Sequence, residues 1–204
     1  MATALYGLPT LLAQDIFHPL PVDPVANILS HPSFLPLPGA LNFRDIAHAA
    51  HPHPKPNLIY CAGALTNLTD DGKRHLTDPG VTRVYDLCSK PKRAHVPAIE
   101  IAGVRTVGVF GAVLRGFLEE DGGLVFCCTA GKGRTGVLAA VVLGIVGAPR
   151  SVIAADYVLT RIGTEPAREV LLAFLLAHNP GLGKESRGFR NFCQTSEEVM
   201  EFVS

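Results

Sequence analysis

The sequence predicts one α/β domain whose central, mainly parallel sheet has four or five strands, with helices on both faces. Short apolar segments rich in β-branched and aromatic residues, at 81–87, 104–110 and 124–126, are typical of buried strands. They alternate with longer segments of helical spacing, which is the pattern of a parallel sheet covered by helices. The chain has 204 residues, of which 48% are hydrophobic, and this is enough for one sizeable core.

The first 38 residues are expected to form an extended arm that wraps the domain, with room for one short helix. Prolines restrict the backbone and interrupt regular structure. This stretch contains Pro19, Pro21, Pro24, Pro32, Pro36 and Pro38. We therefore divide the chain into a proline-rich arm at 1–38, packed on the domain, and the domain itself at 39–204.

The next segments predict a turn, a helix and a strand. Residues 51–56 alternate histidine or lysine with proline, which indicates a turn between two strands. These histidines are not expected to bind a metal, because no further ligands cluster nearby. Residues 69–76 suit a helix that Thr69 caps. Gly80 is expected to end this helix before the strand at 81–87.

The remaining helices are expected to pack the core rather than to carry chemistry. A short helix is predicted at 113–120, and the nearly continuous apolar residues at 137–146 indicate a buried one. Helical spacing of apolar residues then marks 151–160 and 165–177, and a last short helix is predicted at 196–203.

The most informative segment is residues 127–136, which read Cys-Cys-Thr-Ala-Gly-Lys-Gly-Arg-Thr-Gly between an apolar strand and an apolar helix. Gly131 and Gly133 allow the backbone to curl so that successive amide N–H groups point inward, and the helix beginning near Thr135 adds its partial positive charge. An oxyanion would be held there. The predicted phosphate-binding residues are Thr129, Ala130, Gly131, Lys132, Gly133, Arg134 and Thr135.

Cys128 is the predicted nucleophile, because the dipoles that attract an anion also stabilise a thiolate. Arg134 suits two phosphate oxygens through its planar guanidinium, and Lys132 adds a second cation. Thr135 is expected to hydrogen-bond to the sulfur and to assist its departure from a phosphocysteine. The alternative is that the loop only connects the strand to the helix and that Cys128 is a buried core residue without a catalytic role. The spacing of cysteine, glycines, cations and hydroxyl in one loop favours catalysis.

With this loop, the chain resembles the cysteine-dependent protein tyrosine phosphatases. Four further segments narrow the resemblance to the tyrosine phosphatase-like family of bacteria and fungi: residues 41–46, 58–65, 81–89 and 153–160. The resemblance runs from Gly39 to the C-terminus, apart from one gap. It implies a cysteine phosphatase-like fold and hydrolysis of phosphate monoesters through a phosphocysteine intermediate, with no metal or other cofactor.

The resemblance also implies the class of substrate. We expect a phosphorylated protein, cleaved by a protein tyrosine or dual-specificity phosphatase. A phosphoinositide or a small phosphate ester is an alternative, because residues 130–135 are similar to the loop of phosphoinositide phosphatases. A second alternative is a catalytically impaired pseudophosphatase that binds phosphorylated ligands, and a third is sulfur transfer at a rhodanese-like loop.

The chain departs from the family after the strand at 104–110. Relatives insert a long, mostly helical segment that covers the active site, and an aspartate soon after this strand is their general acid. No aspartate occurs between Ile101 and Glu120, so a shortened connection and an uncovered site are expected. Asp86 and Asp45 are the candidate replacements. Asp86 is preferred, because strand carboxyl ends converge on the ligand crevice, and its alternative role is to support the loop.

Further departures lie within the matching segments. Cys127 stands where the family usually has histidine, Gly133 where it has aspartate, and Cys88 where it has arginine. Arg44 is expected either to contact phosphate or to pair with Asp45.

Composition favours no large anionic partner. Lys and Arg total 18, as do Asp and Glu, so the net charge is zero and favours neither nucleic acid nor an anionic membrane. The five cysteines fit a reducing compartment, and oxidation could pair Cys128 with Cys88 or Cys61. The sequence carries no secretory signal and no apolar run of about 18 residues, so we expect a soluble, cytoplasmic protein.

Overall fold

A computed structural model describes residues 7–48, 55–96, 98–108, 122–179, 181, 183 and 185–195. Its sheet has five strands in the order β1-β2-β5-β3-β4. They are β1 Arg44–Asp45, β2 Ile59–Ala62, β3 Val81–Asp86, β4 Arg105–Val107 and β5 Gly123–Cys127. β1 pairs antiparallel with β2 and the other neighbours pair in parallel, which confirms the predicted mainly parallel sheet.

Helices precede, separate and follow these strands. They are α1 Leu8–Leu12, α2 Val22–Leu29, α3 Asp70–Thr77, α4 Lys90–His95, α6 Gly133–Ile145, α7 Arg150–Val158, α8 Thr160–Gly163, the 3₁₀ helix η1 Glu165–Ala167, α9 Arg168–Ala177 and α10 Arg187–Cys193. The predicted helices at 113–120 and 196–203 lie outside the described residues. No helix in the described ranges is long and apolar enough to cross a membrane.

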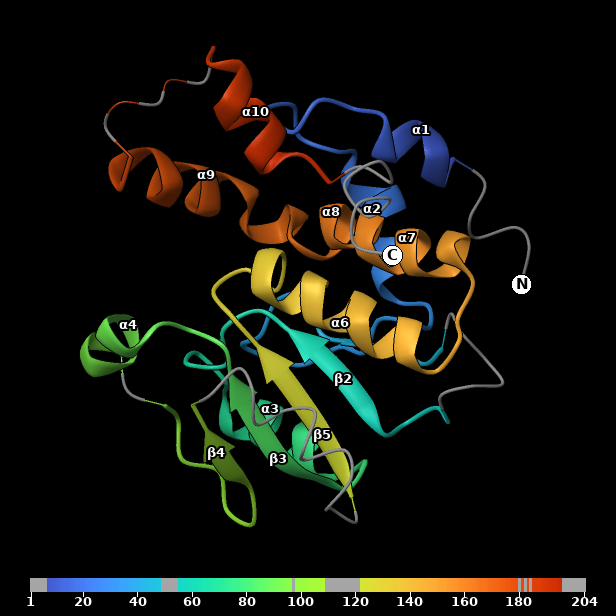
Figure 1. Cartoon of the computed structure of the whole chain (residues 1–204), viewed down its shortest axis with the longest axis vertical. Coiled ribbons are helices and arrows are strands. Elements are labelled where there is room, and N and C mark those ends of the chain that lie inside the picture. The colour runs from blue at the N-terminus through green and yellow to red at the C-terminus, as the bar shows by residue number, and fades with distance from the viewer. Residues whose placement is uncertain are drawn as a thin grey trace.

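Alternate side chains of the central strand β5 enter two separate cores. Leu124 and Phe126 pack in the core that α6 and α7 cover, whereas Val125 and Cys127 pack in the core that includes α3. This alternation follows from the two-residue period of a strand. The helices therefore cover both faces of the sheet, as predicted, and α6 and α3 lie on its opposite sides in Figure 1.

Residues at the two ends of α3 predicted the position of this helix correctly. The hydroxyl of Thr69 accepts a hydrogen bond from the Gly72 amide at 3.0 Å, which is the predicted cap. Gly80 follows this helix with a φ of +82°, a conformation that favours glycine. The sequence did not predict α4 or α10, because both are short and neither shows a clear apolar period.

The described part of the N-terminal arm, residues 7–38, contains two short helices, α1 and α2, where one was expected. Val25 and Ile28 of α2 are buried against Ile162 of α8. The backbone amide of Leu20 donates to Glu165 Oε1 at 2.8 Å. The arm therefore contacts the helices that follow α7, and these contacts hold it beside the helical layer.

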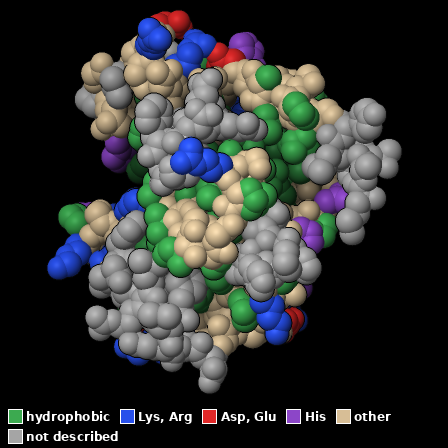
Figure 2. All heavy atoms as spheres, turned by 45° about the vertical axis from the view of Figure 1, so that its right-hand side comes forward, with side chains coloured by type: hydrophobic (Ala, Val, Ile, Leu, Met, Phe, Trp, Pro, Cys, Tyr) green, Lys and Arg blue, Asp and Glu red, His purple; other side chains and the backbone are tan. Residues whose placement is uncertain are grey.

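One side of α6 is exposed and apolar. Val137, Val141 and Ile145 are spaced four residues apart, and each is at least one third exposed. Figure 2 shows hydrophobic side chains around the middle of one face of the molecule. The opposite side of α6 packs on the sheet.

Candidate active site

The loop between β5 and α6 lies at the carboxyl edge of the sheet, as the sequence predicts. β5 ends at Cys127 and α6 begins at Gly133, two residues before the predicted start near Thr135. In the strands that flank β5, Ala62 and Asp86 are level with Cys127. Three strand ends therefore converge beside the loop (Figure 1), where parallel sheets commonly bind ligands.

The two loop glycines differ in what they require. Gly131 has a φ of +69°, and a Cβ at this position would lie 2.7 Å from the carbonyl carbon of Ala62. Glycine is therefore needed at 131. Gly133 is the first residue of α6, and a Cβ there would meet no atom within 4 Å. Contrary to the prediction, the loop has no conformational need for glycine at 133.

The backbone amides of residues 129–134 are open. None of them donates a hydrogen bond to an acceptor in the part of the chain that the structure describes. Contacts from outside hold the loop instead. The carbonyl of Thr129 accepts from the Ala64 amide, and that of Gly131 accepts from Asn42 Nδ2, both at 3.1 Å. Free amides around the N-terminus of a 13-residue helix are an arrangement that can bind an oxyanion.

Cys128 is the first residue of this loop and is buried, in the same core as Cys61 and Cys88. Burial raises the pKa of Cys61 to about 12. Burial, and after it the Asp86 carboxylate, raises the pKa of Cys127 well above its ordinary value. Cys61 and Cys127 therefore remain thiols at neutral pH and are poor nucleophiles, because the thiolate is the reactive form.

Arg134 and Thr135 lie in the first turn of α6. Arg134 is exposed, and its Nη1 donates to the carbonyl of Leu87 at 2.5 Å, which links the loop to the end of β3. The Thr135 hydroxyl is buried and has no hydrogen-bond partner among the described residues, so its predicted bond to Cys128 is not formed. An unpaired buried hydroxyl costs about 1–3 kcal/mol, so a ligand that paired with it would stabilise the site.

Two lysines connect the loop to helices. Lys132 Nζ donates to the carbonyl of Phe192 in α10 at 2.6 Å and lies 5.8 Å from the centre of that ring. Lys92 Nζ donates from α4 to Thr129 Oγ1 at 2.5 Å and lies 5.7 Å from the centre of the Phe174 ring. Sequence reasoning missed Lys92, although a basic run directly after β3 was the available signal.

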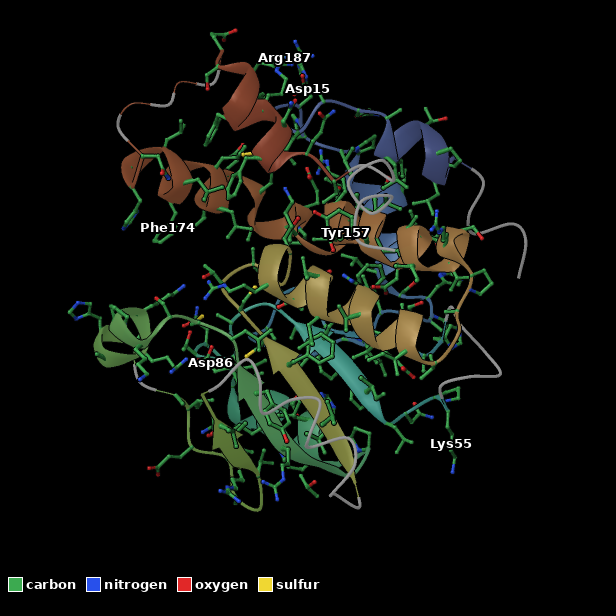
Figure 3. All side chains as sticks on the ribbon, in the orientation of Figure 1. Asp15, Lys55, Asp86, Tyr157, Phe174 and Arg187 are labelled. Carbon is green, nitrogen blue, oxygen red and sulfur yellow. The ribbon has the colours of Figure 1, made fainter. Side chains whose placement is uncertain are left out.

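Asp86 is at the loop. It is level with Cys127 at the end of β3 (Figure 3), and its Oδ1 accepts a hydrogen bond from the Cys88 amide at 2.8 Å. It therefore supports the turn that leads into α4. In the described ranges, no three or more His, Cys, Asp or Glu side chains form a group that could hold a metal ion.

Asp45 is farther back in the sheet. It pairs with Tyr60, which lies two residues before the end of β2, or about 7 Å along the strand. Its two carboxylate oxygens accept from the amides of Ala47 and Asn57, at 2.9 and 2.8 Å. Asp45 therefore holds a turn, and Asp86 is the candidate acid that the fold brings to the loop.

A buried polar network supports the loop from β1 and α7. The Arg44 guanidinium donates two hydrogen bonds to the Asp156 carboxylate. Nε donates to Oδ1 at 3.3 Å, and Nη2 donates to Oδ2 at 3.2 Å. Burial lowers the pKa of Arg44, but the charge and hydrogen bond of Asp156, together with the nearby Cys61, outweigh it and the pKa is raised. Arg44 Nη1 also donates to Asn42 Oδ1, and Asn42 in turn donates to the Gly131 carbonyl. Arg44 therefore pairs with Asp156, and the predicted pairing with Asp45 is wrong. The alternative, a contact with phosphate, stays a prediction.

A pocket of about 250 Å³ adjoins the loop. Its apolar walls include Leu65, Val84, Val96, Ile99 and Ile101, with Asp86, Lys92 and Arg93 as its charged groups. Phe174 of α9 closes one side. Pockets for drug-sized molecules usually measure about 300–1,000 Å³, so this one suits a smaller group.

Comparison with known proteins identifies the family. A model of the tyrosine phosphatase family matches residues 35–109 and 104–203, which together span most of the chain. The chain belongs to the tyrosine phosphatase family. This confirms the resemblance seen in the sequence.

A curated protein is similar to a short segment of this tyrosine phosphatase family member. A tyrosine-protein phosphatase from Nostoc commune is 40% identical over 42 residues, which is 21% of the chain. The alignment spans 14% of that relative's length. The similarity therefore supports the family, and it leaves the activity of the whole protein to be inferred from the site.

The match to the family model consists of two segments, which meet where the sequence departs from its relatives. Its two segments overlap at residues 104–109, around β4, where the relatives' long insertion was expected to be missing. The predicted helix at 113–120 lies outside the described residues. A shortened connection after β4 stays a prediction for this tyrosine phosphatase family member.

Lys132 should make oxyanion binding depend on pH. Burial lowers the pKa of its ammonium to about 8, although the nearby Cys193 opposes the shift. Below pH 8 the charged ammonium attracts an anion, and above it the neutral amine does not. We therefore expect tungstate affinity, measured by calorimetry, to fall about tenfold as the pH rises through 8.

Lys132→Arg is the matched control, because arginine keeps its charge across this range. Its tungstate affinity should be much less sensitive to pH near 8. If the tungstate affinity of Lys132→Arg falls with pH as much as that of wild type, a titrating group other than Lys132 causes the pH dependence.

Proposed function

We propose that the chain hydrolyses phosphate monoesters through a phosphocysteine formed at Cys128. The observation that carries this proposal is the open row of amides at 129–134, next to a buried cysteine at the carboxyl edge of the sheet. The substrate is a phosphorylated protein, attacked by a tyrosine or dual-specificity phosphatase, with a phosphoinositide or small phosphate ester as the further candidates. The proposed setting is the cytoplasm, and the reaction needs no metal or cofactor.

The first step transfers the phosphoryl group to the enzyme. The Cys128 thiolate attacks phosphorus, the bond to the substrate oxygen breaks, and that oxygen leaves with the electron pair. Amides 129–134 and the Arg134 guanidinium stabilise the charge on the three remaining oxygens. One N–H on Arg134 Nη1 is bound to the Leu87 carbonyl, and the guanidinium has four further N–H donors.

The second step returns the thiolate. Water attacks the phosphorus of phosphocysteine, phosphate leaves, and the sulfur recovers its electron pair. Thr135 is proposed to bind an oxygen of the phosphoryl group through its hydroxyl, which lacks a partner among the described residues. Lys132 adds charge at the rim of the loop.

A pseudophosphatase that binds phosphorylated ligands is the second candidate. The lack of an evident general acid supports this candidate. The sequence has no aspartate between Ile101 and Glu120, and the Asp86 carboxylate already accepts a hydrogen bond from the Cys88 amide. General acid catalysis is typically worth about 100- to 10,000-fold. A chain without it would keep its anion site and lose most of its turnover on poor leaving groups.

Turnover is therefore expected to depend steeply on the leaving group. Aryl phosphates with electron-withdrawing substituents should react about 100-fold or more faster than phosphotyrosine peptides, because an unprotonated phenolate must depart unaided. Steady-state kinetics over a series of substituted phenyl phosphates measures this slope.

Asp86→Asn and Asp45→Asn separate the two candidate acids. A flat dependence on the leaving group, together with a changed pH profile in Asp86→Asn, would show a competent replacement acid and contradict the steep slope. Asp45→Asn is the control, because both Asp45 oxygens already accept backbone amides. The absence of hydrolysis of every aryl phosphate, with oxyanion binding retained, would favour the pseudophosphatase.

A further inference from the structure

The rim of the loop carries a positive charge that the zero net charge of the chain hides. α4 contains Lys90, Lys92, Arg93 and His95 but no acid, and none of its residues is buried. Within the described ranges, no carboxylate forms an ion pair with these four side chains. α4 projects from the body of the molecule beside the carboxyl edge of the sheet in Figure 1.

Exposed apolar side chains surround these cations. Val96, directly after α4, is 42% exposed, Phe174 of α9 is 43% exposed and Phe192 of α10 is 64% exposed. In Figure 3, Phe174 lies on the side of α9 that faces α4 and the strand ends. Exposed apolar groups that gather around a functional edge indicate a contact surface.

Hydrogen bonds and cation–π contacts join these groups into one surface around the loop. Lys92 reaches both Thr129 of the loop and the Phe174 ring, while Lys132 of the loop reaches Phe192. The surface therefore runs from α4 across the loop to α9 and α10. We define the basic rim as Lys90, Lys92 and Arg93 of α4 and Lys132 of the loop, with Val96, Phe174 and Phe192.

We propose that the basic rim docks on the surface of an anionic lipid membrane. Lysine and arginine are attracted to anionic headgroups, and exposed aromatic and aliphatic side chains enter the interface. Reversible membrane binding generally needs two such signals, and the rim supplies both. This proposal goes beyond the phosphatase reaction and does not depend on turnover.

The arrangement favours a membrane over an acidic protein. An acidic protein would satisfy the cations but leave the separate apolar side chains without a matching pocket. A lipid interface accepts them individually, because it is fluid. Docking in this way would turn the open loop toward phosphorylated groups at the membrane surface.

Vesicle flotation of the full chain tests the proposal. We expect wild type to float with vesicles of phosphatidylcholine mixed with phosphatidylserine, and not with phosphatidylcholine alone. Binding should fall several-fold at high salt, because salt screens the cations. Lys90→Gln should weaken it about fivefold. Phe174→Ser with Phe192→Ser should weaken it about tenfold or more.

Ile145→Ser is the matched control. Ile145 is 69% exposed but lies at the other end of α6, about 18 Å along the helix from Gly133. It should bind vesicles as wild type does. Thermal unfolding of each variant checks that the fold is retained, and Lys90→Gln tests the rim independently of the aromatic pair.

Several results would overturn the proposal. They are no flotation of wild type with the mixed vesicles, binding that salt leaves unchanged, or equal losses in Ile145→Ser and the aromatic pair. Binding to polyglutamate that requires Lys90, without vesicle binding, would assign the rim to an acidic protein instead. Each result leaves the phosphatase proposal intact, because turnover is measured on soluble aryl phosphates.

Discussion

Cys128→Ser is expected to lower the hydrolysis of an activated aryl phosphate by about 10,000-fold or more, while tungstate affinity changes little. Serine has nearly the shape of cysteine, but its hydroxyl does not supply a thiolate. The amides of 129–134, which are open in the described structure, remain available to the anion. Steady-state kinetics and calorimetry measure the two effects separately.

Cys127→Ser is the matched control for this substitution. The Cys127 side chain packs in the core that includes α3, and burial keeps it a thiol. We expect this variant to lose some stability and to retain turnover. In wild type, acid quenching and peptide mass spectrometry should find the phosphoryl group on Cys128. Equal activity of wild type and Cys128→Ser would rule out the enzymatic proposal.

Asp156→Ala is expected to lower the free energy of unfolding by about 3–5 kcal/mol. Arg44 is fully buried, and Asp156 holds its guanidinium through two nitrogens. The variant would leave that charge buried without its carboxylate. Denaturant unfolding measures the loss. Asp71→Ala is the surface control, because Asp71 is half exposed in its ion pair with Arg74 and should change stability by less than about 1 kcal/mol.

Arg44→Met combined with Asp156→Leu separates stability from positioning. Apolar side chains of similar size remove both charges, so most of the lost stability should return. Turnover of this double variant should remain below that of wild type. Arg44 donates a hydrogen bond to Asn42, and Asn42 donates one to the Gly131 carbonyl, so the loop would lose this support. A loss of stability in Asp156→Ala no larger than in Asp71→Ala would contradict the role given to this network.

The sheet and the loop were predictable because their signals are local. The apolar run of β5, the glycine at 131 and the apolar start of α6 are consecutive in the sequence, and each follows from backbone preference or burial. Thr69 was predictable as a cap for the same reason, since it bonds to an amide three residues away. The helices α4 and α10 escaped prediction, because their place depends on contacts with distant segments.

The sequence by itself determined the α/β class, the candidate site of anion binding and Cys128 as the candidate nucleophile, because neighbouring residues build a strand, a curled loop and a helix start. Only the tertiary structure decided the partners of the charged groups. Arg44 meets Asp156 across 112 positions and Lys132 meets Phe192 across 60. Such pairs form because packing brings distant segments together, and residue type alone does not select which carboxylate or carbonyl a cation will reach.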